Sequence, residues 1–176
     1  MYRTRLLAIT LLALPAISAP EAKRVEGDLH QDVLNTIAAY KKKDPGMKKF
    51  FDGAVGYAVF PSVGKGAVGI GGAAGSGELI VGGKAIGKTK LSQITVGLQL
   101  GGQSYSEIIF FQKSKPLDEF KKGDLTFAAQ TSAVALASGA SADAAYKNGV
   151  VVFTQENGGA MFEASVGGQK FSFDPY

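Results

Sequence analysis

ITVGLQLG, residues 94–101, alternates apolar side chains with small or polar ones at every second position. Successive side chains of an extended chain point to opposite faces, so the apolar residues of this segment would share one face. They are Ile94, Val96, Leu98 and Leu100. A period of two is typical of a half-buried strand. We therefore predict a β-strand here, with this apolar face toward a core.

Similar short apolar runs occur on both sides of this strand, and they predict a protein made mainly of β-structure. They fall at residues 55–60, 79–85, 107–112, 150–155, 161–166 and 170–173. Glycine accounts for 24 of the 176 residues, and glycines inside strand patterns mark bulges, corners or close backbone contacts. We expect a mainly antiparallel, curved or barrel-like sheet.

An amphipathic helix is predicted over residues 20–40, before the β-rich part. One apolar residue recurs at every fourth position, which places the set on one helix face: Val25, Leu29, Val33 and Ile37. The sequence Asp44-Pro45-Gly46 ends this helix. Three lysines at positions 41–43 precede that stop, where positive charge complements the helix dipole.

A second, shorter helix is predicted over residues 114–122, with Ser114 as its N-cap and Pro116 in its first turn. The small apolar residues of 127–137 fit a helix or a strand equally well. Together the patterns predict an α+β fold class. It would combine a glycine-rich antiparallel sheet, an N-terminal amphipathic helix and one or two short helices.

The first 19 residues have the order of a secretory signal peptide. Arg3 and Arg5 give a positive start, residues 6–14 are apolar, and small residues at 16–19 offer a cleavage site after Ser18 or Ala19. We therefore expect an exported protein, periplasmic or secreted, with one domain over residues 20–176. The apolar run is shorter than the roughly 20 residues that span a bilayer, so no transmembrane helix is expected in the mature form.

Composition narrows the possible partners. Loss of Arg3 and Arg5 would reduce the formal net charge from +4 to +2, which does not support a global nucleic-acid surface. The chain has no cysteine, so disulfides cannot stabilise the exported protein. Folding must depend on packing alone.

Two glycine patterns resemble nucleotide-binding motifs but lack the required context. Residues 82–89 fit the phosphate-loop pattern, which must open into a helix, yet residues 91–100 alternate as a strand. Residues 64–69 fit the dinucleotide pattern, but the glycine-rich sequence that follows is a poor helix start. We interpret both as bends in β-structure.

Residues suited to catalysis are scarce. His30 is the only histidine and is expected to be exposed or at the rim of the helix, so the usual zinc sets and most Ser-His arrangements are missing. Glu107 and Glu163 each stand alone in a β-pattern. A hydrolase that uses two carboxylates stays open as a minor alternative. We predict no enzyme activity, no cofactor and no metal.

Several long blocks of the chain resemble the SYLF domain, also called the Ysc84-like domain. They are residues 56–66, 71–77, 96–111, 148–154 and 163–171. In order, they cover nearly all of the mature chain, which would be an exported bacterial member. The resemblance implies binding of phospholipid or phosphoinositide, with an amphipathic N-terminal helix as the membrane contact; that helix maps to residues 23–43. It implies no catalytic residues.

The predicted lipid-binding site lies at the end of this helix. Its members are Lys41, Lys42, Lys43, Lys48, Lys49, Phe50 and Phe51. The lysines would approach anionic headgroups at a membrane surface while Met47, Phe50 or Phe51 enters the interface. The alternative is that the aromatic residues belong to the core and the lysines only solvate a helix end. A second functional hypothesis is a structural or protein-binding module of the cell envelope.

Overall fold

A computed structural model describes residues 20–68, 70–96, 103–127, 133–157 and 166–176. The predicted signal peptide lies outside these residues, as do residues 97–101 of the first predicted strand and 161–165 of a later one. Within these described residues, the elements in chain order are α1 (Pro20–Lys43), η1 (Pro45–Met47), α2 (Lys48–Gly53), β1 (Gly56–Val68), β2 (Ile70–Val81), β3 (Lys84–Val96), β4 (Gln103–Phe111), α3 (Ser114–Lys122), β5 (Val134–Ala135), β6 (Val150–Glu156) and β7 (Lys170–Pro175).

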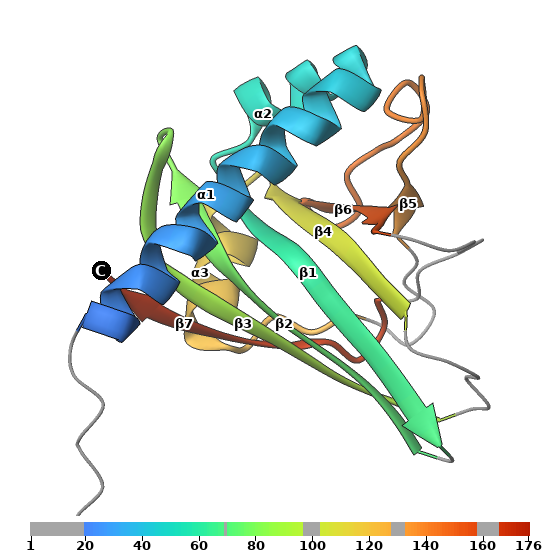
Figure 1. The fold of residues 1–176 in the computed structure, drawn as a ribbon. Helices are drawn as coiled ribbons and strands as arrows, with labels where there is room; N and C mark the ends of the chain where they lie inside the picture. The colour runs from blue at the N-terminus through green and yellow to red at the C-terminus, as the bar shows by residue number, and fades with distance from the viewer. Residues whose placement is uncertain (1–19, 69, 97–102, 128–132, 158–165) are drawn as a thin grey trace, which may run out of the picture.

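The described strands form one curved sheet in the order β5-β6-β4-β1-β2-β3-β7 (Figure 1). All neighbours in it are antiparallel except β5 and β6, which are parallel. The α+β class and the mainly antiparallel sheet are thus confirmed. The sheet is not a closed barrel, because β5 and β7 stand at its two ends.

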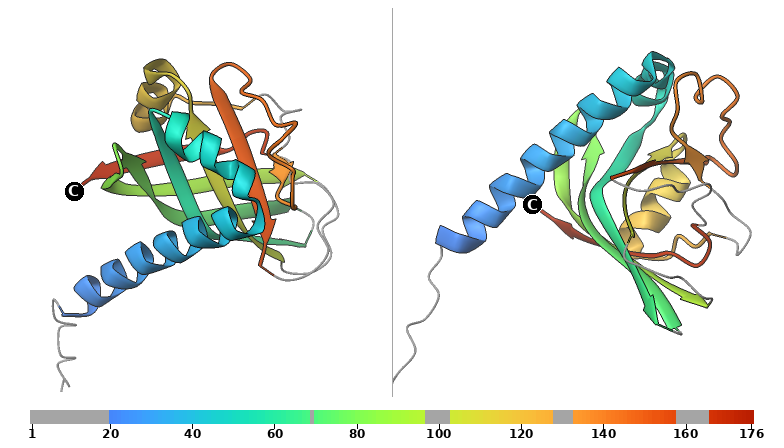
Figure 2. Two further views of the ribbon diagram at one scale, coloured as in Figure 1. Left: turned by 90° about the horizontal axis from the view of Figure 1, so that it is seen from above. Right: turned by 45° about the vertical axis from the view of Figure 1, so that its right-hand side comes forward.

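Helices cover both faces of the sheet (Figure 2). On β1, Ala58 and Phe60 pack into a core cluster with α3, whereas Val59 points to the cluster shared with α1 and α2. On β4, Phe111 packs into the cluster with α3, and Phe110 packs into the cluster with α1 and α2. A strand buried on both faces needs apolar residues at consecutive positions. This explains the continuous runs in β1 and β4.

Glycine permits a tight irregularity between β1 and β2. The register of this pair shifts between Val59 and Ser62. A Cβ on Gly77 would overlap the carbonyl oxygen of Val59, and one on Gly75 would lie 2.8 Å from the carbonyl oxygen of Ser62. The prediction that strand glycines mark close backbone contacts is confirmed at these two positions.

Two details of the predicted strands are wrong. Predicted strand 79–85 includes a turn, because Gly82 and Gly83 have φ of +58° and +78° and connect β2 to β3; a two-residue hairpin turn favours such glycines. Ile94 was expected to face the core, yet it is 79% exposed while Gln93 is 4% exposed. Gln93 tolerates burial because its Nε2 donates a hydrogen bond to the Gly167 carbonyl at 2.8 Å.

The helix predictions are largely confirmed. Helix α1 covers the predicted range and continues through Lys43, and α3 has the predicted bounds with Pro116 in its first turn. Ser114 is not the cap of α3, however, because Lys113 occupies that position without a side-chain hydrogen bond. Within the described residues, no helix is both long and apolar enough to cross a membrane.

Candidate functional site

The five predicted lysines lie together where the chain reverses between α1 and α2. We call Lys41, Lys42, Lys43, Lys48 and Lys49 the lysine corner; all five side chains are exposed. Asp44 fixes the reversal. Its Oδ1 accepts a hydrogen bond from the Gly46 backbone N–H at 3.0 Å, and its Oδ2 accepts one from the Ser141 backbone N–H at 2.7 Å. The Ser141 N–H is the main cause that lowers the pKa of this carboxyl group.

Neighbouring groups restrain three of these lysines. The Lys41 ammonium lies 4.6 Å from the centre of the Phe51 ring, and the Lys49 ammonium lies 5.0 Å from that of Phe50. Lys49 also donates to the Ala142 carbonyl at 3.4 Å, and Lys48 forms an ion pair with Asp52. Among the described residues, Lys42 and Lys43 have no ion-pair partner. Two of the five charges are therefore available without breaking a contact.

The aromatic residues beside the lysine corner are partly or wholly core residues. Phe50 is 3% exposed and packs against Phe153, Tyr146 and Phe110, with ring centroids 5.0, 5.5 and 5.7 Å away. Phe51 is half-buried and makes an edge-to-face contact with Phe110 at 4.9 Å. Met47 is buried as well. Phe50 and Met47 could thus enter a membrane only by leaving the core.

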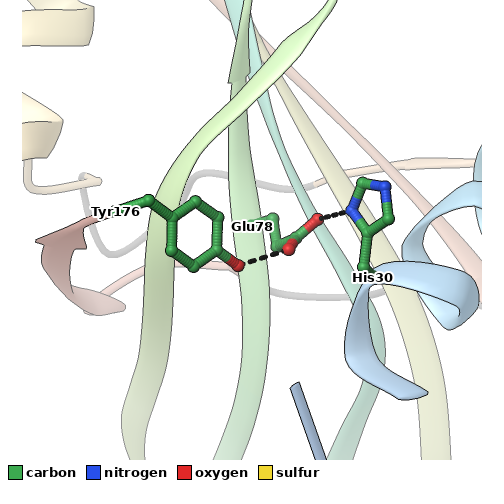
Figure 3. A network of polar contacts seen from close by, with 3 residues as sticks. All are labelled: His30, Glu78 and Tyr176. Carbon is green, nitrogen blue, oxygen red and sulfur yellow. Dashed lines mark hydrogen bonds and ion pairs between the residues drawn. The ribbon is translucent and has the colours of Figure 1, made fainter. Parts of the chain in front are cut away.

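A second polar cluster joins α1 to the sheet (Figure 3). Glu78 of β2 has a side chain that is 1% exposed, and its two oxygens accept hydrogen bonds from different elements. His30 Nδ1 lies 2.7 Å from Oε2, and the Tyr176 hydroxyl donates to Oε1. The prediction of a rim position for His30 is confirmed, since its side chain is 50% exposed. Glu78 is not among the residues predicted from the sequence, although a lone carboxylate next to the apolar Leu79 and Ile80 was a signal.

The His30 and Glu78 pair does not form a recognisable hydrolytic site. Within the described residues, His30 makes no hydrogen bond to a serine or threonine hydroxyl, which a triad would require. The lone carboxylate Glu107 is fully buried and accepts a hydrogen bond from Gln169 Nε2 at 3.0 Å. The two carboxylates lie on opposite faces of the sheet, since the β-sheet partner of Glu78 is Val59 and that of Glu107 is Phe60. Glu163 lies outside the described residues.

The remaining motifs have structural explanations. The phosphate-loop pattern at 82–89 is the β2–β3 turn followed by β3, so no helix N-terminus is available there to bind a phosphate. Residues 64–68 of the dinucleotide pattern belong to β1. In the described part of the chain, no group of three His, Cys, Asp or Glu residues could hold a metal ion.

Comparison with protein families matches the second half of the chain. The Ysc84 family model, described as "Las17-binding protein actin regulator", matches residues 92–175, which contain β4, α3 and β5 to β7. No curated protein matches the chain. The match contains three of the five sequence blocks identified above, residues 96–111, 148–154 and 163–171, so residues 92–175 of the chain are similar to the Ysc84, or SYLF, family.

Proposed function

We propose that this protein is a non-enzymatic binding module that attaches to anionic phospholipid surfaces through the lysine corner. The observation behind the proposal is that five exposed lysines lie at one turn, where Asp44 accepts two backbone hydrogen bonds. The match of residues 92–175 to the family supports a lipid- or protein-binding module, because the family is one of binding domains. Anionic phospholipids and phosphoinositides are the ligand class that this charge would attract.

The electrostatic contribution of the lysines to the binding free energy predicts weak and reversible attachment to a membrane. Each lysine near an anionic membrane contributes about 1 kcal/mol. The five lysines would together give at most about 5 kcal/mol, or a Kd of roughly 0.2 mM. Partial entry of Phe51, which is half-buried, would add about 1 kcal/mol. A peripheral protein of the exported compartment, periplasmic or secreted, would bind in this way.

The second candidate is a structural or protein-binding module of the cell envelope. The family description names a protein-binding activity, and two features of this chain would suit such a role. Ile94 is a large apolar side chain in open contact with solvent, and β7 stands at one end of the sheet. Apolar side chains exposed beside a sheet edge are a common element of protein interfaces.

Vesicle flotation separates the two candidates. The protein is mixed with phosphatidylglycerol vesicles, phosphoinositide-containing vesicles or neutral phosphatidylcholine vesicles, at low and at physiological salt. The lipid proposal expects flotation with the two anionic compositions, loss of flotation at high salt, and none with neutral vesicles. Absence of flotation with every composition, together with co-purification of one envelope protein, would favour the second candidate.

A further inference from the structure

A cavity of about 660 Å³ opens beside β6, between α3 and the segment of residues 143–148. Its volume is within the range of about 300–1,000 Å³ that is usual for small-molecule sites. The apolar part of its wall includes Leu125, Phe127, Ala133, Val134, Val150 and Val152. These side chains come from three separate segments, so the cavity is a product of the tertiary fold.

The chemistry of the wall changes from the inside to the mouth. Leu125, Val150 and Val152 are buried, and Phe127 packs half-buried against the same core cluster. The charged lining residues are Asp143 and Lys147, which are exposed, and Glu119, whose side chain is 41% exposed, and this exposure places all three at the opening. Water inside an apolar cavity would lack the two to four polar partners that an ordered water requires. The wall therefore suits an amphiphile with an apolar tail inside and a polar end outside.

The cavity and the lysine corner share one structural element. The Ser141 backbone N–H binds Asp44, the Ala142 carbonyl accepts from Lys49, and the Tyr146 ring packs on Phe50. Asp143, Ala144, Ala145 and Lys147 of the same segment line the cavity. A membrane surface in contact with the lysine corner would consequently lie one short segment away from the cavity wall.

We propose that the cavity binds one hydrocarbon chain of a membrane phospholipid. The inference rests on the proposed function only for the source of the chain, because the apolar wall and the charged mouth are features of the cavity itself. The charged side chains at the mouth, Glu119, Asp143 and Lys147, suit the polar end of a phospholipid better than they suit a fully apolar compound. The tail then occupies the interior, and the headgroup stays in solvent.

Chain binding is measurable without a membrane. A polyene fatty acid whose fluorescence rises in apolar surroundings is titrated into the wild-type protein, and lysophospholipids of increasing chain length compete for the site. Each methylene that enters the cavity should strengthen competition about fourfold, the equivalent of ~0.8 kcal/mol, until the cavity is full. Competition by the lysophospholipids is expected. Binding of the free fatty acid alone, or no saturable binding, would overturn the proposal.

Two variants place an aromatic ring on the cavity wall, and one matched variant does not. Ala133→Phe and Ala145→Phe should each weaken fatty-acid binding at least tenfold. Ala142→Phe changes an exposed alanine of the same segment that is not in the cavity wall, and it should bind like the wild type. Equal affinity in all three variants would overturn the proposal.

A photo-crosslinking experiment on the wild type requires no variant to fold. A diazirine-labelled fatty acid should modify peptides that contain residues 125–127 or 143–152, whereas labelling spread over other surfaces would contradict the assignment.

The lysine-corner proposal and the cavity proposal can fail independently of each other. Lysine-corner variants should keep fatty-acid binding while they lose vesicle binding, and cavity variants that bind no fatty acid should still attach to anionic vesicles.

Discussion

Replacing Lys41, Lys42 and Lys43 with glutamine is the sharpest test of the lysine corner. The change removes three charges and keeps side chains of similar length. At about 1 kcal/mol per lysine, it should weaken binding to anionic vesicles by up to about 150-fold. The loss should be smaller at physiological salt, where the Debye length is about 8 Å and exposed charges are screened. Binding to neutral vesicles should barely change.

The structure limits the effect of this triple variant on folding. Of the three substituted lysines, only Lys41 contacts an aromatic ring among the described residues, that of Phe51, and an exposed cation–π contact contributes about 0.5–1 kcal/mol. For a protein of this size, 1 kcal/mol corresponds to a Tm change of roughly 2–4 °C. A thermal melt followed by circular dichroism should therefore show a folded variant with a slightly lower Tm.

A matched control separates position from net charge. Lys113, Lys115 and Lys122 are also exposed, and they belong to α3 or directly precede it, on the other face of the sheet. Their replacement with glutamine removes the same charge and should leave vesicle affinity close to that of the wild type. Two results would refute the reasoning: a folded 41–43 variant that binds anionic vesicles at low salt as tightly as the wild type, or a control variant that loses as much affinity.

Three further predictions concern stability. Gly77→Ala should lower the free energy of unfolding by more than about 2 kcal/mol in urea titrations, because its Cβ would overlap the Val59 carbonyl; Gly53→Ala, where a Cβ meets open space, should change it little. Glu78→Ala should lower the free energy of unfolding by about 1–3 kcal/mol, because it removes the acceptor of two hydrogen bonds. Hydrogen exchange in residues 28–33 of α1 should become faster, and unchanged exchange would show that this carboxylate does not anchor the helix. Burial raises the pKa of Tyr40 and Tyr105 above that of an unfolded tyrosine. Their contribution to the free energy of unfolding is therefore complete below pH ~10 and is lost as the pH rises further. In Tyr105→Phe, the midpoint of urea unfolding should fall less steeply with rising alkaline pH than in the wild type.

Local patterns predicted the parts of this fold that depend on local chemistry. The four-residue period and the stop at Asp44-Pro45-Gly46 were sufficient to predict α1 and the lysines at its end. The two adjacent aromatic residues that follow gave no indication of which ring is buried. The structure decides this through Phe110 and Phe153, which lie about 60 and 100 positions away along the chain.

The remaining features depend on partners that are distant in sequence. The face of β3 was predicted incorrectly at Ile94 because the carbonyl of Gly167 makes burial of Gln93 possible. Glu78 is paired with a histidine 48 positions earlier and a tyrosine 98 positions later. The apolar wall of the cavity needs three segments to meet. No periodic pattern in the sequence corresponds to these contacts, so they could not be predicted from residues that are neighbours along the chain.

The packing of α1 decides how the lysine corner meets a membrane. The resemblance to lipid-binding relatives implied that the helix itself is the membrane contact, which here would require its apolar face to leave the sheet. Val33 and Tyr40 are fully buried in that face, and burial of each contributes about 1.5–3 kcal/mol. The Tyr40 hydroxyl also donates to the Ser106 carbonyl at 2.9 Å, which contributes about 1 kcal/mol. Together with the Glu78 anchor, these terms equal or exceed the ~5 kcal/mol that five lysines can supply. Attachment through the lysine corner should therefore leave α1 on the sheet, and hydrogen exchange of residues 33–40 should be as slow on anionic vesicles as in solution.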